Sequence, residues 1–440
     1  MLRRILTLSL LALAVGAGAA GAQSFSARGM AMGGVILAGG GAGSSGANVA
    51  YRAVPRAPSS GWTLPLPIGL IPVLADPPEL DPDSPDFNVY ELANLLYNPP
   101  WNLQLSAPGT PSNDITITIG KDHLAMDLGD VKNVFPRDQS RIGTVVNGPT
   151  LGFGIKRFFL AAAPLVHYEN DLSFNDALRG AIDGEAFRPN TSYEMVDRGR
   201  GQVAAGVHLG WAGPLVLTGD PRGKGLGFYA GARLKLMRGL AYASADNSAA
   251  FTTGDEILAV DPVNINYLGH FYETGPGGGG LGRGLDAGVV WMARGSEVGL
   301  GVNDIGTTFH WHVEESIVSR DPGSGDYVRQ VIASDVPLRS TVPTTAVANA
   351  ATHIGRFLVA GDVVCHVRAT TAHLGAETWL GKAIALRAGA SVDENDLLQY
   401  AGGAGVRLGR IGVDLAVASH SRNLARERGL ELGAGLAFYR

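Results

Sequence analysis

The chain has little cysteine and little charge. Cys365 is the single cysteine among 440 residues, so no intramolecular disulfide can form. Charged residues make up 17% of the chain, against about 25% in an ordinary soluble protein. The formal net charge is −5. Because nucleic-acid binding relies on a basic surface, we expect no nucleic-acid partner.

Long apolar runs are also absent, with one exception at the N-terminus. There the basic segment Met1–Arg4 precedes the apolar run ILTLSLLALAV and small residues that end in Ala20-Gly-Ala22. This order is that of a secretory signal peptide, which we expect to occupy residues 1–22. No later run is long enough for a membrane-spanning helix. The exported chain is then either a soluble periplasmic protein or an outer-membrane barrel.

A catalytic or cofactor-binding motif is missing too. The segment Gly41–Gly46 fits the dinucleotide pattern G-x-G-x-x-G. That pattern needs a helix after the third glycine and an acidic residue about 20 positions further on. Pro55 and Pro58 interrupt any such helix, and the first acidic residue of the chain is Asp76. We therefore expect neither an enzyme nor a cofactor.

Glycine, in contrast, is abundant. The chain has 62 glycines, about twice the ordinary share of roughly 7%. Many lie in runs of about ten residues in which two faces alternate. In the run Leu430–Tyr439 one face carries Leu, Ala and Phe, and the other carries Glu, Gly, Ala and Tyr. The same alternation occurs at 203–211, 228–236, 285–291, 384–387, 400–408 and 411–417. About ten residues is the length that a tilted strand needs to cross a bilayer.

Two folds alternate in this way, a soluble β-sandwich and a transmembrane barrel. A sandwich needs a solvent face rich in Lys, Glu, Thr and Ser, whereas the second face here holds small residues and isolated charges. Short polar turns also alternate with long connections, which is the bacterial barrel pattern. We therefore predict an all-β antiparallel barrel that spans the outer membrane and is surrounded by its lipid. Short helices are expected at 88–98 and 172–183.

The segment that follows the predicted signal peptide carries a family resemblance. Its sequence SARGMAMGGVILA (Ser26–Ala38) resembles the opening of the FadL-like superfamily, the outer-membrane long-chain fatty-acid transporters and their relatives. Ala31-Met32-Gly33-Gly34 matches the A-x-G-M-G-G-A segment of that superfamily, and Asn48-Val49-Ala50 stands where N-P-A is usual. Later runs at 282–293, 297–306, 373–379 and 386–417 resemble its C-terminal strands.

The resemblance implies a barrel of about 14 strands, with an N-terminal segment folded into the lumen as a hatch. The expected parts are a signal peptide at 1–22, the hatch at 23–60, and the barrel at 61–440 with long extracellular loops and short helical insertions. A segment packed inside a barrel needs small residues, which this one has in number. The expected hatch residues are Met30, Met32, Gly33, Gly34 and Asn48.

Isolated charges on the small-residue face form the candidate ligand site. Four cations share this face: Arg233, Lys235, Arg387 and Arg407. In the functional interpretation they bind the head group of an amphipathic ligand whose tail lies on apolar lumen walls. In the structural alternative they pair with carboxylates, since opposite charges in a confined interior usually pair. The carboxylates on the same face are Asp286, Asp362, Glu377 and Asp414.

Two further patterns are weaker. His310-Trp311-His312 puts two imidazoles on one strand face, which is half of a metal site. No thiol or carboxylate completes it at a matching spacing, so no metal is expected. Trp211, Trp291 and Trp379 are candidates either for the aromatic girdle of a barrel or for ordinary core packing.

The leading hypothesis is a porin-like protein for passive uptake or binding of hydrophobic or amphipathic small molecules such as long-chain fatty acids. The alternative, also implied by the superfamily, is a non-transporting barrel scaffold of a secretion or conjugation-type envelope system, with an envelope protein as its partner. A soluble periplasmic β-protein, which salt would release from membranes, is the third hypothesis.

Overall fold

The computed structural model describes residues 26–36, 44–55, 62–75, 103–106, 116–119, 124–127, 140–147, 151–255, 266–275, 279–321, 324–365, 370–393, 398–420 and 429–439. The predicted signal peptide and the predicted helix at 88–98 lie outside these residues. None of the helices within them is long and apolar enough to cross a bilayer.

Strands dominate the described residues. They are β1 (Trp62–Leu66), β2 (Leu103–Ser106), β3 (Thr116–Ile119), β4 (Leu124–Asp127), β5 (Ser140–Asn147), β6 (Leu151–Ile155), β7 (Phe158–Phe174), β8 (Ser192–Thr218), β9 (Leu226–Thr252), β10 (Asn266–Glu273), β11 (Leu281–Ala293), β12 (Ser296–Arg320), β13 (Tyr327–Thr341), β14 (Thr345–Ile354), β15 (Phe357–Cys365), β16 (Thr370–Leu380), β17 (Ile384–Asp393), β18 (Leu398–Leu408), β19 (Ile411–His420) and β20 (Gly429–Phe438). The short helices are α2 (Ala27–Ala31), α3 (Ser44–Ala47), η2 (Val49–Arg52), α4 (Leu70–Ala75) and α6 (Asp176–Ile182).

All strands except the β3–β4 hairpin join one sheet, in which 18 strands are described. Four crossings of the wall are each made of two consecutive strands, because both strands pair with the same neighbour. These crossings are β1 with β2, β5 with β6, β10 with β11, and β13 with β14. Eighteen strands with four such pairs make 14 antiparallel crossings. The predicted antiparallel barrel of about 14 strands is therefore confirmed.

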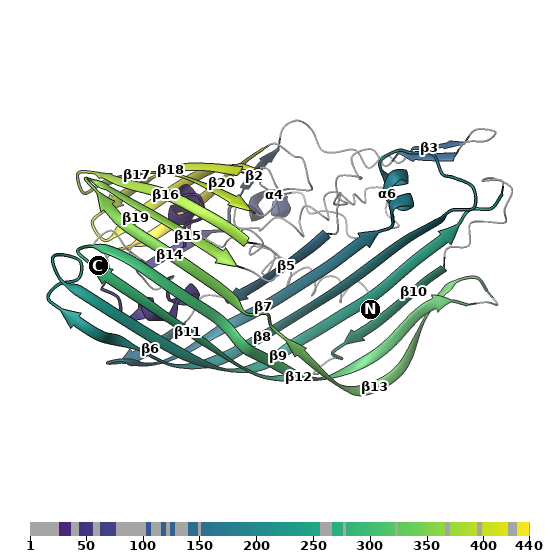
Figure 1. The fold of residues 1–440 in the computed structure, drawn as a ribbon, viewed down its shortest axis with the longest axis horizontal. Coiled ribbons are helices and arrows are strands. Elements are labelled where there is room, and N and C mark those ends of the chain that lie inside the picture. Colours follow the sequence, from purple (N-terminus) through teal and green to yellow (C-terminus); the bar gives the residue numbers. More distant parts are fainter. Residues whose placement is uncertain are drawn as a thin grey trace.

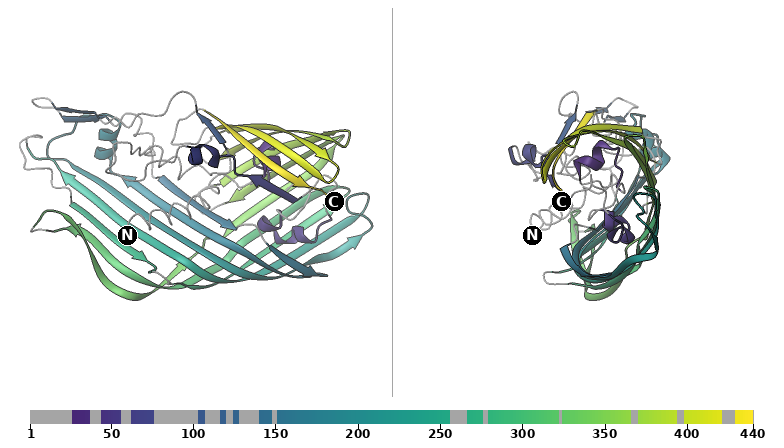
Figure 2. Two further views of the ribbon diagram at one scale, coloured as in Figure 1. Left: turned by 180° about the vertical axis from the view of Figure 1, so that it is seen from behind. Right: turned by 90° about the vertical axis from the view of Figure 1, so that its left-hand side faces the viewer.

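The sheet curls into a barrel wall (Figures 1 and 2). It runs from β1 and β2 through β20 to β14, then through β12, β9 and β8 to β7, β6 and β5. No ladder joins its two outer strand pairs, β1/β2 and β5/β6, in the part of the chain that the structure describes. The predicted helix at 172–183 is found as α6, whose first turn is capped by the Asn175 side chain accepting from Leu178 N–H at 2.9 Å.

The two ends of the barrel differ. The strands β8, β9 and β12 have 27, 27 and 25 residues, and they reach well past the short strands β14 to β20 toward the end that carries α6 (Figure 1). The opposite end has tight turns. Arg294 and Gly295, which join β11 to β12, have φ of 52° and 79°, as a two-residue type I′ hairpin requires.

The two faces of the wall carry opposite chemistry, as the alternation predicts. On β9, Leu234 is 43% exposed whereas its neighbour Lys235 is fully buried. Exposed leucine, valine and isoleucine side chains continue round the outer face on β11, β12 and β15 to β20. Many charged residues of the same strands face inward and are buried, among them Asp286, Asp304, Asp362, Glu377, Arg387 and Asp414. An exposed apolar band of this extent suits lipid and not water.

The N-terminal residues lie inside this wall. Helix α2 packs against β17 to β20, and the turn η2 packs against β8, β9 and β11. Met32, Ala31 and Ala50 are almost fully buried. The right-hand view of Figure 2 shows these purple helices enclosed by the curved sheet.

Glycines of the wall leave room for this N-terminal backbone. Gly288 is the cross-strand neighbour of both Gly231 and Gly301, and these three residues lie beneath Ala47 to Ala50. A Cβ on Gly288 would come within 2.0 Å of the Asn48 side-chain oxygen. A second pair, Gly375 and Gly389, lies beneath Met32 and Gly33. Gly231, Gly301, Gly375 and Gly389 therefore allow two backbones to approach closely, and Gly288 leaves room for the Asn48 side chain.

Replacing Gly389 with alanine should unseat the N-terminal segment without unfolding the wall. The new Cβ would lie 2.2 Å from the Met32 backbone carbon, which cannot yield as a side chain can. Limited proteolysis of the folded protein should then cut within residues 26–36 of Gly389→Ala but not of the parent.

The control is Gly435→Ala, which also faces α2 but would meet Ala27 Cβ at an ordinary 3.7 Å. Equal cleavage of Gly389→Ala and Gly435→Ala would contradict this role of Gly389.

Candidate functional site

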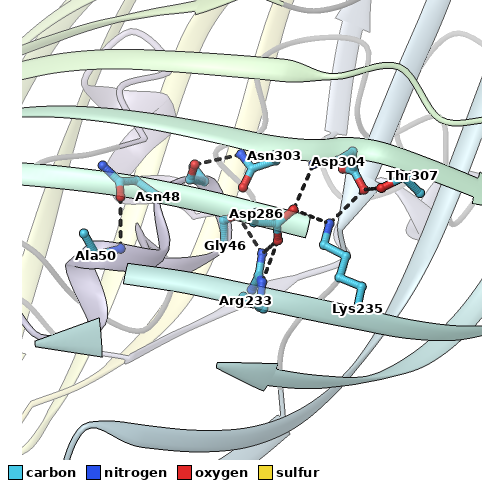
Figure 3. A network of polar contacts seen from close by, with 10 residues as sticks. Gly46, Asn48, Ala50, Arg233, Lys235, Asp286, Asn303, Asp304 and Thr307 are labelled. Carbon is cyan, nitrogen blue, oxygen red and sulfur yellow. Dashed lines mark hydrogen bonds and ion pairs between the residues drawn. The ribbon is translucent and has the colours of Figure 1, made fainter. Parts of the chain in front are cut away.

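The candidate site is the buried polar surface between the wall and the N-terminal segment. Its first part is an ion-pair network on β9, β11 and β12 (Figure 3). Asp286 accepts from Arg233 Nε at 2.6 Å and contacts Lys235 Nζ at 2.9 Å. Lys235 also donates to Asp304 at 2.8 Å. We call these four residues, Arg233, Lys235, Asp286 and Asp304, the β9–β12 network.

Asp304 reaches this network through a bulge in β12. Strict alternation from Asn303, which faces inward, would turn Asp304 outward. Asp304 instead has a φ of 60°, a conformation that aspartate tolerates better than most residues, and the register shifts nearby. Its own backbone N–H donates to Asp286 Oδ1 at 2.8 Å. Two consecutive side chains therefore point into the lumen.

The N-terminal segment is bonded to the same region. Arg233 Nη2 donates to the Gly46 carbonyl at 3.4 Å, and Asn303 Nδ2 donates to the Ala47 carbonyl at 2.8 Å. Asn48 caps η2 by accepting from Ala50 N–H, and donates to the Val289 carbonyl at 3.2 Å. The wall thus satisfies backbone carbonyls that would otherwise be buried without partners.

A second network holds α2. Arg28 donates to both carboxylate oxygens of Glu377, at 2.8 and 3.1 Å. Arg387 bridges Glu377 and Asp414, at 2.8 and 2.6 Å. We call these four residues, Arg28, Glu377, Arg387 and Asp414, the α2 network. Burial alone would lower the pKa of Arg28, but Glu377 outweighs it and holds this pKa above its ordinary value, so Arg28 stays charged.

Two smaller sets of contacts also hold the N-terminal segment against the wall. Asp362 accepts from Ile36 N–H at 2.7 Å and is bonded to His373 at 2.6 Å. The Tyr51 hydroxyl donates to Glu297 at 3.3 Å and accepts from Asn349. Burial, followed by the charge of Glu297, raises the pKa of Tyr51 well above its ordinary range, which keeps its hydroxyl protonated as a donor.

The predicted site residues fall into three places. Arg233 and Lys235 lie in the β9–β12 network, and Arg387 lies in the α2 network. Arg407 is apart from both: it lies at the tight-turn end, 4.2 Å from the centre of the Tyr439 ring. Arg233, Lys235 and Arg387 are paired with carboxylates, as the structural interpretation of these charges expected. Ligand binding by the four cations stays a prediction.

The predicted hatch residues all lie in the inner segment. Met30 and Met32 are buried in different apolar clusters, and Gly33 and Gly34 have φ of 73° and 92°, which lets the chain turn after α2. Asn48 is buried as the cap of η2. Movement of this segment as a hatch stays a prediction.

The two networks are electrically balanced. Each contains two cations and two carboxylates. All four residues of the β9–β12 network are nearly or fully buried. Burying an unpaired charge is costly, so balance is the condition under which such groups can be enclosed. Counted over the described residues, neither network has a cation in excess.

A second interior region was missed by the sequence reasoning. It is a buried apolar cluster toward the end that carries α6, made of Leu165, Ala204, Met237, Tyr242, Phe309, Trp311, Val313 and Val342. Trp311 is 1% exposed and donates to Ser340 Oγ at 2.8 Å, and Ser340 donates to Gln202 on β8. Because β13 and β8 are not neighbours in the sheet, this contact crosses the interior.

The sequence does carry a signal for this cluster. The residues at odd positions from Phe309 to Val313 are apolar, whereas the candidate metal half-site used the even positions His310 and His312. These two histidines face outward, and His312 pairs with Asp335 at 2.8 Å. In the described ranges no group of three or more His, Cys, Asp or Glu side chains is placed to hold a metal. Trp291 is exposed on the outer face, whereas Trp379 faces inward and donates to Glu377.

Comparison with known proteins gives structural matches only. No protein-family model matches the chain, and no curated protein matches it. A TodX ΔS2S3 mutant, a monoaromatic hydrocarbon channel, matches with 10% identity and a TM-score of 0.34 over 74% of this chain and 87% of that one. The Pseudomonas putida toluene transporter TodX matches with 10% identity and a TM-score of 0.28 over 70% and 90%. A mutant Rh. blastica porin matches with 12% identity and a TM-score of 0.21 over 63% and 100%.

At these identities and TM-scores the matches carry no argument about the family or the site of this chain. The assignment of the site rests on the geometry of this chain.

Removing one charge of the β9–β12 network should cost more than removing an opposite pair. Lys235→Met leaves Asp304 buried without its cation, which should lower the free energy of unfolding by about 3–5 kcal/mol. Lys235→Met combined with Asp304→Asn restores balance and should recover most of that loss. Urea unfolding in lipid vesicles, followed by tryptophan fluorescence, measures both. A double variant less stable than Lys235→Met would contradict the balance argument.

Proposed function

We propose that the chain is an outer-membrane barrel through which small hydrophobic molecules enter passively. The exposed apolar outer face supports placement in a membrane, and the tight turns and long strand extensions at opposite ends suit the periplasmic and extracellular sides of a bacterial barrel. The outer membrane is then its location, after export. No step of this function requires an enzyme or a cofactor.

The observation that carries the proposal is the apolar cluster around Trp311. In a channel for polar solutes the narrow part of the lumen would be lined by charged or hydrogen-bonding groups. Here Leu165, Phe309 and Trp311 meet across the interior instead. A hydrophobic molecule that enters from the α6 end would replace their mutual contacts with contacts of the same kind.

The balanced networks bear on the chemistry of the ligand. A long-chain fatty acid carries a carboxylate, and its burial needs a cation that is not already paired. Arg233, Lys235 and Arg387 each have carboxylate partners within 3 Å. An uncharged hydrocarbon needs no such partner. We therefore propose uncharged hydrophobic molecules as the preferred ligands and fatty acids as poorer ones.

The N-terminal segment then acts as the hatch. Residues 26–36 and 44–55 lie toward the tight-turn end and are held by both networks. Passage to the periplasm requires a movement of this segment, and the two networks set how readily it moves.

Uptake by whole cells tests this function, because their intact outer membrane slows the entry of hydrophobic compounds. Cells that express the chain should take up labelled toluene faster than cells with an empty vector, and labelled benzoate no faster. The carboxylate should make at least a tenfold difference, since enclosing an unpaired charge costs several times RT (~0.6 kcal/mol).

Variants locate the path. Trp311→Ala should alter the rate of toluene uptake, whereas Trp291→Ala, which removes a tryptophan of the outer face, should leave it unchanged. No uptake above the vector, together with stoichiometric recovery of an envelope protein on the purified barrel, would instead support the scaffold hypothesis. Faster benzoate than toluene uptake would reverse the proposed ligand preference.

A further inference from the structure

The outer face of the wall carries a row of cations at one edge of its apolar band. Arg238 on β9, Arg283 on β11, His310 on β12 and Arg339 on β13 are all exposed. We propose that these four residues, here called the basic row, bind the phosphate groups of an anionic glycolipid in the outer leaflet. This inference rests on the proposed membrane setting but not on transport.

Strand pairing brings the basic row together. Leu281 is the direct cross-strand neighbour of Arg238 on one side and of His310 on the other, and His310 is the neighbour of Arg339. Direct neighbours in an antiparallel ladder share a face, so all of these side chains point outward with the exposed Leu281. Arg283 is two residues from Leu281 on the same strand and therefore on the same face.

The row lies where lipid head groups would be. Below Arg238 the outward residues of β9 are Leu236, Leu234, Ala232, Ala230 and Phe228, and the last of these pairs with Trp291 near the tight turns. Ten residues of a strand tilted by about 40° cover roughly 25 Å, the height of a barrel's apolar band. The aromatic pair thus marks the periplasmic edge of the band, and the basic row marks the extracellular edge.

These arginines have no protein partner in the described part of the chain. The side chains of Arg238, Arg283 and Arg339 make no hydrogen bond or ion pair there, whereas the inward cations of the same strands are all paired. The nearest outward carboxylate along β13, Asp335, pairs with His312. The positive charge of the row is therefore not cancelled locally.

The described residues of β15 to β19 lack such a feature. Among the described residues, no Lys, Arg or His lies on the outward face of β15 to β19, whose outward residues at this edge include Val363, Leu374, Val392, Leu398 and Val417. A general preference for polar residues at the membrane edge would have placed cations there as well. The row is instead confined to four adjacent strands.

The spacing favours a lipid with more than one phosphate. From Arg238 to Arg339 there are three strand spacings, about 14 Å in all. One phosphate cannot contact both ends of such a row, whereas a glycolipid with two phosphates on one sugar backbone can. Guanidinium groups bind phosphate oxygens in a bidentate manner, and the acyl chains would lie on the apolar band directly below.

The test is lipid binding by the full mature chain in neutral detergent, measured by native mass spectrometry. Diphosphoryl lipid A should bind more tightly than phosphatidylcholine, and raised salt should weaken it. The variant Arg238→Gln, Arg283→Gln, Arg339→Gln should bind it about 100-fold less tightly, at about fivefold for each arginine. The matched control, Arg157→Gln, Arg294→Gln, Arg356→Gln, removes the same charge from exposed arginines at the tight-turn end and should bind as the parent does.

Four results would overturn the inference. They are equal binding of diphosphoryl lipid A and phosphatidylcholine, an equal loss in the control variant, displacement of the lipid by inorganic pyrophosphate at the same concentration, and equally tight binding of monophosphoryl lipid A. The first two remove the site, the third makes it a site for soluble phosphates, and the fourth removes the two-phosphate argument. Toluene uptake is not needed for any of them, so failure of the proposed function would be seen separately.

Discussion

The cost of enclosing charge is the constraint on which the interior of this barrel depends. The wall turns Arg233, Lys235 and Arg387 away from the apolar exterior, and once inside they need carboxylates. Both networks meet that need with equal numbers of cations and anions. In the α2 network one cation, Arg28, comes from the N-terminal segment. Its ion pair with Glu377 therefore both holds the segment in place and neutralises a carboxylate of the wall.

The abundance of glycine follows from the same arrangement. A segment held by short ion pairs must lie close to the wall, and side chains on the wall would keep it away. Gly288 and Gly389 remove that obstacle beneath Asn48 and Met32. The glycines of the opening segment have a different role, since Gly33 and Gly34 turn the chain after α2. Gly46, the last residue of the G-x-G-x-x-G pattern, accepts a hydrogen bond from Arg233 through its carbonyl.

Alternation predicted most of the wall, because a residue's face in a strand depends only on its neighbours. It placed Lys235 and Leu234 on opposite faces. The approximate number of crossings came instead from the resemblance of the N-terminal segment to the FadL-like superfamily. Alternation failed where a bulge interrupts it. The bulge in β12 turns Asp304 inward, and a two-residue alternation does not predict where a bulge will occur. It also could not foresee that Ser340 and Gln202, 138 residues apart, would meet across the lumen, because that contact depends on how the whole sheet curls.

The central claim is that residues 26–36 and 44–55 are held inside the barrel by the two balanced networks. Hydrogen–deuterium exchange of the mature protein in lipid vesicles measures this directly. The account predicts that the backbone amides of Met30 and Ile36, which donate to Ser26 and Asp362, exchange as slowly as amides of the wall strands. Exchange of these amides at the rate of an unstructured peptide, while the wall strands stay protected, would contradict it.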